Sequence, residues 1–282
     1  MATMFMVFPR GKEKAITLSY DDGVQSDARL IQIMQANGLK GTFNINSGLY
    51  APEGKVYPEG TYSRRMTQSE ATALYADSGM EVAVHSLSHP YLEQLDEGAC
   101  CYEIAADRKN LEDQFQTIVK GMAYPYGTYN ESVVECLRRC GIVYARTVVS
   151  SHNFDLPKDW LMLPATCHHK DGKLEDLTDR FLNGTVKREP WLFYLWGHSY
   201  EFERDNNWEV IESFAQKVGN REDIWYATNM EIYSYVTSYG KLEFSADGNR
   251  IYNPTAVTLY YRVSGKDGFH VECIQPGEMK IK

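Results

Sequence analysis

The sequence has no uninterrupted stretch of about 18 apolar residues, so it predicts no helix that spans a membrane. It has no cluster of basic residues either: 29 lysines and arginines stand against 38 aspartates and glutamates, and the formal net charge is −9. An acidic chain without a basic patch does not fit nucleic acid or an anionic membrane surface as a partner. None of the six cysteines forms a CxxC pair, which excludes the commonest zinc and redox motifs.

The first 15 residues also lack two features of a secretory signal peptide. They contain an apolar patch, but neither a basic beginning nor a cleavage site of small residues. We therefore expect a cytoplasmic protein whose thiols are reduced. Hydrophobic residues make up 43% and charged residues 24% of the chain, which is the composition of a folded globular protein. Nothing in the sequence points to a protein partner.

What the sequence does contain is a regular alternation of apolar runs and amphipathic helical segments. Seven runs have the composition of β-strands, and most of them are followed by a segment with helical periodicity. The seven runs are 14–20, 40–46, 80–86, 120–127, 142–149, 191–198 and 223–229. This alternation predicts a parallel sheet that closes, or nearly closes, into a barrel. From about residue 241 apolar and polar residues alternate, so we expect a barrel over residues 1–240 and a small antiparallel β appendage over residues 241–282.

Polar residues stand where several of these runs end. Asp21 and Asp22 end the first run, His85 and His89 follow the third with HxxxH spacing, and His198 ends the sixth. Taken singly, adjacent aspartates usually form a solvated turn or a helix N-cap, and an HxxxH pair is more often two unrelated histidines. All of them, however, fall on one rim of the predicted barrel, where the chemistry of such barrels collects. Two imidazoles and a carboxylate are a common open ligand set for Zn²⁺ or a similar ion, and a second carboxylate can face the bound water as a general base.

Four segments of the sequence together resemble the NodB-type polysaccharide deacetylases, carbohydrate esterase family 4. The segments are LSYDDG (18–23), HSLSHP (85–90), AYPYG (123–127) and LWGHSYE (195–201). The resemblance covers roughly residues 12–238 and keeps the family's motif order. It implies a distorted (β/α)7 barrel, in agreement with the seven runs. It also implies a hydrolase that removes acetyl groups from an N-acetylated sugar, oligosaccharide or polysaccharide.

The same resemblance implies a cofactor, one divalent metal ion. By the family's motifs, Asp22, His85 and His89 would hold it. Zinc is the metal expected first, with cobalt or nickel as alternatives.

The remaining motif residues acquire roles in the reaction by resemblance. Asp21 would be the general base, and His198 would be the acid that protonates the leaving nitrogen. The backbone N–H of Tyr126 would donate to the oxyanion. We expect Tyr126 and Trp196 to contact the acetylated carbohydrate.

The third motif departs from the family pattern, because Ala123 stands where an arginine usually orients the catalytic aspartate. We expect Arg146 to replace it. Arg146 lies in the neighbouring apolar run, and adjacent strands of a sheet are only about 4.8 Å apart. The alternative is that Arg146 pairs with a helix carboxylate outside the barrel.

The fourth motif, an acidic segment ending in tryptophan, is only loosely matched by FDLPKDW. Either Asp155 or Asp159 could tune the acid His198, and the sequence does not choose between them. Asp159 in an ordinary loop is the alternative. The nearby His168 and His169 could approach the site, but we expect them to be surface histidines.

Two other functions stay open at this point. The same barrel could hydrolyse a different amide, a cyclic imide or an O-acetyl ester. The chain could also be a carbohydrate-binding relative without catalysis, although the complete set of aspartates and histidines argues against this.

Overall fold

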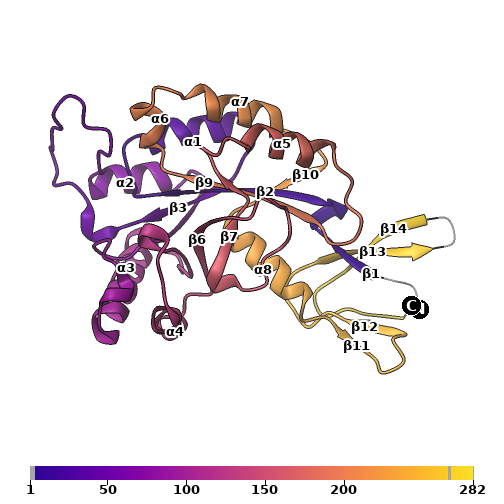
Figure 1. The fold of residues 1–282 in the computed structure, drawn as a ribbon. Coiled ribbons are helices and arrows are strands. Elements are labelled where there is room, and N and C mark those ends of the chain that lie inside the picture. Colours follow the sequence, from indigo (N-terminus) through magenta and orange to yellow (C-terminus); the bar gives the residue numbers. More distant parts are fainter. Residues whose placement is uncertain (1–3, 266–267, 282) are drawn as a thin grey trace.

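The structure is a computed structural model that describes residues 4–265 and 268–281 (Figure 1). A parallel β-sheet forms its centre, and helices pack outside this sheet. Two small antiparallel sheets, built mostly from C-terminal residues, lie together at one end of the molecule. Within the described ranges, no helix is both long and apolar enough to cross a membrane.

The central sheet consists of parallel strands in a closed order. That order is β7 (Leu163–Ala165), β6 (Tyr144–Ser150), β5 (Gly121–Ala123), β4 (Glu81–Val84), β3 (Gly41–Ile45), β2 (Lys14–Asp21), β9 (Trp191–Gly197) and β8 (Cys167–His168). A single residue, Thr166, separates β7 from β8, and its N–H donates to the carbonyl of Tyr194 in β9 at 2.8 Å. The two short strands therefore act as one interrupted strand that closes the ring. With β7 and β8 counted as one strand, the ring has seven strands, and the expected (β/α)7 barrel is confirmed.

The position of the seventh strand differs from the sequence prediction. Residues 163–168 occupy it, whereas the predicted run 223–229 supplies β10 (Ile224–Tyr226), which pairs with the start of β2. Since β9 covers one edge of β2, β10 shares the other edge with β3. Segment 163–168 was missed because it is short, contains a proline and has polar residues at its end.

Helices follow most barrel strands and cover the outside. They are α1 (Asp27–Ala36), α2 (Gln68–Tyr75), α3 (Glu97–Phe115), α4 (Glu131–Arg139), α5 (Leu174–Asn183), α6 (Tyr200–Arg204), α7 (Glu209–Val218) and α8 (Asn229–Tyr239). Short 3-10 turns are η1 (Pro9–Gly11), η2 (Ser47–Leu49), η3 (Leu92–Gln94), η4 (Pro125–Gly127) and η5 (Trp160–Met162). Figure 1 shows α1, α5 and α7 together over one side of β2 and β9.

The central strand β2 explains how the site is oriented. All eight of its residues are buried, and they alternate between two environments, as side chains of a strand must. Ile16, Leu18 and Tyr20 belong to the core between sheet and helices. The alternate positions therefore face the inside of the barrel, and the last of them is Asp21. The strand thus delivers one buried carboxylate to the interior at its carboxyl end.

The C-terminal strands form the expected small antiparallel structure, and the N-terminus joins it. One sheet contains β1 (Met4–Val7), β13 (Leu259–Gly265) and β14 (Gly268–Ile274), and the other contains β11 (Glu243–Phe244), β12 (Arg250–Tyr252) and β15 (Met279–Ile281). Tyr235 of α8 connects the first sheet to the barrel. Its hydroxyl donates to the carbonyl of Val7 at 2.7 Å and accepts from the N–H of Tyr260 at 2.9 Å.

Candidate metal centre and active site

The carboxyl ends of the barrel strands bring polar side chains to one hollow of about 320 Å³. Of the residues to which the sequence analysis gave a role in metal binding, catalysis or substrate contact, all except Arg146 line this hollow directly. The lining residues are Asp21, Asp22, His85, His89, Tyr124, Tyr126, Gly127, Val148, Trp196, His198 and Tyr200. The structure thus brings together residues that lie far apart in the sequence.

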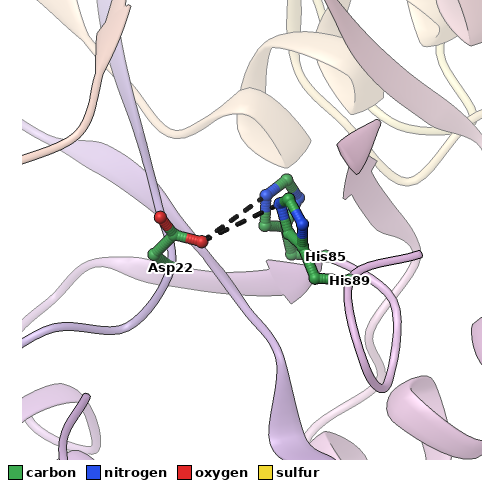
Figure 2. Close-up of side chains that lie close together, drawn as sticks. All are labelled: Asp22, His85 and His89. Atoms are coloured by element: carbon green, nitrogen blue, oxygen red, sulfur yellow. Dashed lines mark ion pairs between the residues drawn. The ribbon is translucent and has the colours of Figure 1, made fainter. Parts of the chain in front are cut away.

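Asp22, His85 and His89 converge on one point, as Figure 2 shows. Oδ1 of Asp22 is 3.9 Å from Nε2 of His85 and 4.0 Å from Nε2 of His89. All three atoms lie within 4.8 Å of one another, so one cation could be bound by all of them. Nδ1 of His85 is 2.8 Å from the carbonyl of Ala123. Because a carbonyl only accepts, this nitrogen carries the hydrogen, and Nε2 is left with a free lone pair.

The protonation state of His85 also suits a metal ligand. Its side chain is almost fully buried, and burial lowers the pKa of His85 to about 4 despite the nearby carboxylates. The imidazole is therefore neutral near pH 7, which is the form that binds a metal. On donor type, distance and tautomer, the three residues fit a divalent ion such as zinc.

Asp21 lies next to this cluster and forms a buried ion pair with Arg146. Its Oδ2 accepts a hydrogen bond from Nη2 of Arg146, and its Oδ1 accepts one from Nδ2 of Asn44 at 2.8 Å. The Arg146 and Asp21 side chains are only 1% and 3% exposed. Burial alone would raise the pKa of Asp21, but Arg146 and two nearby histidines outweigh it and hold the pKa at about 2. Arg146 therefore lies where the sequence analysis expected it.

The ring of Trp196 packs against the guanidinium of Arg146. The guanidinium carbon of Arg146 lies 4.2 Å from the centroid of the Trp196 ring, in a cation–π contact. The same tryptophan makes an edge-to-face contact with His168, with ring centroids 4.5 Å apart. Trp196 lines the hollow but is 8% exposed, so most of its surface is occupied by these protein contacts.

His198 lies between two carboxylates. Its Nε2 is 3.9 Å from Oδ2 of Asp21, and its Nδ1 is 3.4 Å from Oε2 of Glu201. Burial would lower the pKa of His198, but Glu201, Asp21 and Asp22 together outweigh burial and raise it. Glu201 is the second residue of α6 and follows His198 by three residues, so the carboxylate and the imidazole come from one short segment.

The carboxylate beside His198 is thus neither of the two that the sequence suggested. Asp159 accepts from the N–H of Leu161 at 2.8 Å and caps η5, and the side chain of Asp155 is exposed. Sequence reasoning missed Glu201, although the signal was present. A glutamate three residues after His198, at the start of a helix, faces back toward it.

The prediction that His168 and His169 are surface residues is wrong. His169 is 2% exposed, and the side chain of His168 is 20% exposed. Their Nε2 atoms lie 3.3 Å and 3.1 Å from Oε2 of Glu201, so this carboxylate faces three imidazoles. They were misjudged because the polar segment that carries them has no strand-like pattern, yet His168 lies in the barrel strand β8 and His169 follows it directly.

A second cluster of possible ligands lies beside the first, but its histidine ring hydrogens are placed differently. His168, His198 and Glu201 also offer three ligand atoms within 4.8 Å of one another. Nδ1 of His168, however, accepts from the N–H of Lys170 at 3.0 Å. In the neutral ring the hydrogen is then on Nε2, the atom that faces Glu201. The arrangement favours hydrogen bonds to Glu201 over metal ligation.

The rim of the hollow holds several strained backbone positions. Asp22, Ser86, His89 and Tyr126 are non-glycine residues with positive φ, at 87°, 63°, 57° and 58°. Such conformations persist only where the surroundings impose them, and they cluster at functional sites. The ring of Tyr126 stacks on Tyr91 with centroids 3.9 Å apart and meets the edge of His89 at 4.5 Å.

Comparison with known proteins connects this geometry to a family. Residues 9–145 match the family model described as polysaccharide deacetylase. The matched segment contains three of the four motifs and ends one residue before Arg146. No curated protein matches the sequence.

Several solved structures are similar to this chain at low sequence identity, and those with a TM-score of 0.50 or more show the same fold. A Mycobacterium smegmatis protein provisionally described as a polysaccharide deacetylase is 18% identical over 85% of this chain and 96% of its own, with a TM-score of 0.61. The peptidoglycan deacetylase PdaC of Bacillus subtilis is 19% identical over 83% of this chain and 96% of its own, with a TM-score of 0.50. The deacetylase PplD of Streptococcus pyogenes, in complex with acetate, is 22% identical over 47% of this chain and 55% of its own, with a TM-score of 0.41.

Proposed function

We propose that this chain is a carbohydrate deacetylase of the polysaccharide deacetylase family, whose model its residues 9–145 match. On this proposal it removes acetyl groups from an N-acetylated sugar, oligosaccharide or polysaccharide with one divalent metal ion. The observation that carries the proposal is the convergence of three ligand atoms, from Asp22, His85 and His89, beside the buried carboxylate of Asp21. Zinc is the metal we propose first, with cobalt or nickel as alternatives, because two imidazoles and one carboxylate leave open positions for water and substrate.

When bound, the ion would act as a Lewis acid: it would polarise the acetyl carbonyl and lower the pKa of a water molecule in the site. Asp21 is the proposed general base. Its low pKa keeps it ionised near pH 7, so it is able to accept a proton. Arg146 and Asn44 each bind one of its oxygens, which supports a fixed orientation beside the ligand cluster.

His198 is the proposed general acid. Hydrolysis of the amide releases an amine, which leaves readily only if its nitrogen is protonated. Nδ1 of His198 faces Glu201, so the hydrogen on Nε2 is directed to the side where Asp21 lies. The raised pKa of His198 increases the fraction of protonated imidazole near neutral pH.

Two further tasks are to stabilise the oxyanion that forms from the acetyl carbonyl and to bind the sugar ring. We propose that the backbone N–H of Tyr126 donates to the developing oxyanion, a type of contact whose loss typically costs about 10²–10³-fold in kcat. The exposed ring of Tyr126 is the proposed contact for a sugar ring, since it is 49% exposed at the edge of the hollow. Trp196, which also lines the hollow, is a further proposed contact.

A panel experiment tests the proposed reaction. Zinc-loaded protein is incubated with N-acetylated monosaccharides, N-acetylated oligosaccharides, acetylated xylan oligomers and a cyclic imide, and acetate or ring-opened product is measured. Acetate released from N-acetylated sugars supports the proposal. Turnover of only the ester or the imide would assign the barrel to one of the other hydrolytic reactions, and no turnover would favour a binding protein.

We also propose a cytoplasmic location. The six cysteines are free thiols, which is the usual state of cysteines in a reducing compartment. Fusion to a fluorescent protein and fractionation of cells would test it.

A further inference from the structure

Asp22 has an unusual backbone conformation, with φ at 87°. An aspartate in this region needs support from its surroundings. Arg65 provides that support, because its Nη1 donates to the backbone carbonyl of Asp22 and its Nη2 donates to Oδ1 of the same residue at 2.9 Å. One guanidinium therefore binds both the main chain and the side chain of a proposed metal ligand.

The backbone that carries Arg65 is itself held beside Asp22. Arg65 forms an antiparallel bridge with Val24, the second residue after Asp22. Two backbone hydrogen bonds flank the bridge, from Met66 N–H to the carbonyl of Gly23 at 3.2 Å and from Gln25 N–H to the carbonyl of Arg64 at 2.8 Å. The Arg65 side chain is 22% exposed and belongs to a fixed segment of the rim.

A second side chain extends this contact to the next ligand. Oδ1 of Asn46 accepts from Nη1 of Arg65 at 2.9 Å. Nδ2 of Asn46 donates to the backbone carbonyls of His85 and Ser86. Asn46 is 1% exposed, so these hydrogen bonds form without competition from water. A continuous chain of hydrogen bonds thus connects Asp22 with the backbone of His85 across the ends of three strands.

We propose that Arg65 and Asn46 are positioning residues that fix the separation and orientation of Asp22 and His85 for metal binding. The inference rests on the proposed function, because it takes Asp22 and His85 as metal ligands. Oδ1 of Asp22 accepts from Arg65 and still faces Nε2 of His85 and His89, so one lone pair serves Arg65 while the other remains for the ion. Partners that orient a ligand in this way typically change metal affinity by about 10–100-fold when removed.

Two effects of Arg65 oppose each other, and the geometry indicates which one dominates. A guanidinium repels a nearby cation, which by itself would weaken metal binding. Without Arg65, however, Asp22 loses the contact that supports its positive φ, and its carboxylate is free to rotate away from the imidazoles. We expect the loss of orientation to outweigh the relief of repulsion.

The test measures metal affinity and does not depend on catalysis. Metal-free full-length protein is titrated with zinc in competition with a chromogenic chelator. Arg65→Met keeps an unbranched apolar chain about as long as the aliphatic part of arginine and removes the guanidinium, so zinc should bind about 10–100-fold more weakly than to the wild type. Arg64→Met is the matched control, because the Arg64 side chain pairs with Glu203 at 2.7 Å and not with a proposed metal ligand. The zinc affinity of this variant should equal that of the wild type.

Two further variants keep the inference falsifiable if Arg65→Met folds poorly by circular dichroism. Arg65→Lys keeps the charge but cannot bind two oxygens of Asp22 at once, so most of the loss should remain. The third comparison combines Arg65→Met with Asn46→Ala. The double variant should lose less zinc-binding free energy than the sum of the two single losses, because both substitutions break the same chain of hydrogen bonds. Wild-type or tighter zinc affinity in folded Arg65→Met or Arg65→Lys would overturn the inference. A wild-type protein that binds no metal would overturn the proposed function itself.

Discussion

Arg146 of β6 donates a hydrogen bond to Asp21 at the end of β2, and both side chains are almost completely buried. The arginine comes from the strand next to Ala123, the position at which the resemblance to the family led us to expect an arginine. A planar guanidinium suits this place because it binds a carboxylate in a fixed orientation. The pair therefore connects the order of the barrel strands to the orientation of the proposed base.

Replacing Arg146 should affect turnover and stability together. Arg146→Ala leaves Asp21 buried without its partner, which should lower the free energy of unfolding by about 3–5 kcal/mol. A carboxylate displaced by about 1 Å should reduce turnover by about 10²-fold, with zinc content unchanged. Arg146→Lys should restore little, because an ammonium lacks the planar fork. Urea denaturation and acetate release measure the two effects, and normal turnover in Arg146→Ala would contradict the assigned role.

Glu201 should set the pH at which the enzyme loses activity on the alkaline side. Its charge is one of the groups that raise the pKa of His198. If His198 is the proposed acid, activity requires its protonated form and falls as the pH rises through this pKa. Glu201→Gln removes the charge and lowers the pKa, which should move the alkaline limb of the kcat/KM profile to lower pH. Glu203→Gln, on the same helix and paired with Arg64, is the control and should leave the profile in place. If the alkaline limb of the Glu201→Gln profile stays at the wild-type pH, Glu201 does not raise the pKa of His198 and the prediction is wrong.

His198 should matter most when the leaving group is poor. His198→Ala should reduce turnover of N-acetylated sugars by about 10²–10⁴-fold, the usual range for a lost general acid. An activated aryl acetate needs no proton on its leaving group, so its hydrolysis should suffer much less. Rates on both substrates, measured with the same zinc-loaded preparations, decide the question. Equal losses on the two substrates would mean that His198 does not act as the acid.

The C-terminal strands should be required for folding. Leu259, Tyr261 and Ile274 are buried in a core that they share with Phe8 and Tyr235. A chain ending at residue 241 would expose these partners and leave β1 without β13, so we expect aggregated protein. Size-exclusion chromatography of the truncated chain measures this. A soluble, zinc-binding truncation that has lost activity would show instead that the C-terminal residues complete the active site.

Much of this arrangement is visible in the sequence because it is encoded locally. Long apolar runs predict most of the barrel strands, and each motif occupies one short segment, so Asp21, Asp22, His85, His89 and His198 could be assigned to one rim. Strand order then brought Arg146 within reach of Asp21. Local pattern carries no comparable signal for β7 and β8, which are short and partly polar and are held by pairing on both sides.

Contacts between distant loops were beyond the sequence for a different reason. The contact between Arg65 and Asp22 spans 43 residues and depends on how a long connection folds back over β2. The convergence of His168 and Glu201 likewise depends on strand closure and on which ring nitrogen carries the hydrogen. Residue type and spacing determine neither of these features.

The central claim is that Asp21 takes a proton while Asp22, His85 and His89 hold a metal ion that the reaction needs. The most direct measurement is acetate release from an N-acetylated oligosaccharide by wild-type protein and by Asp21→Asn, each containing the same measured amount of zinc. We predict that the wild type releases acetate, that a chelator abolishes the release and added zinc restores it, and that Asp21→Asn retains zinc but loses about 10²–10⁴-fold in turnover. Equal acetate release by the two zinc-loaded proteins, or release that persists after complete removal of the metal, would contradict the account.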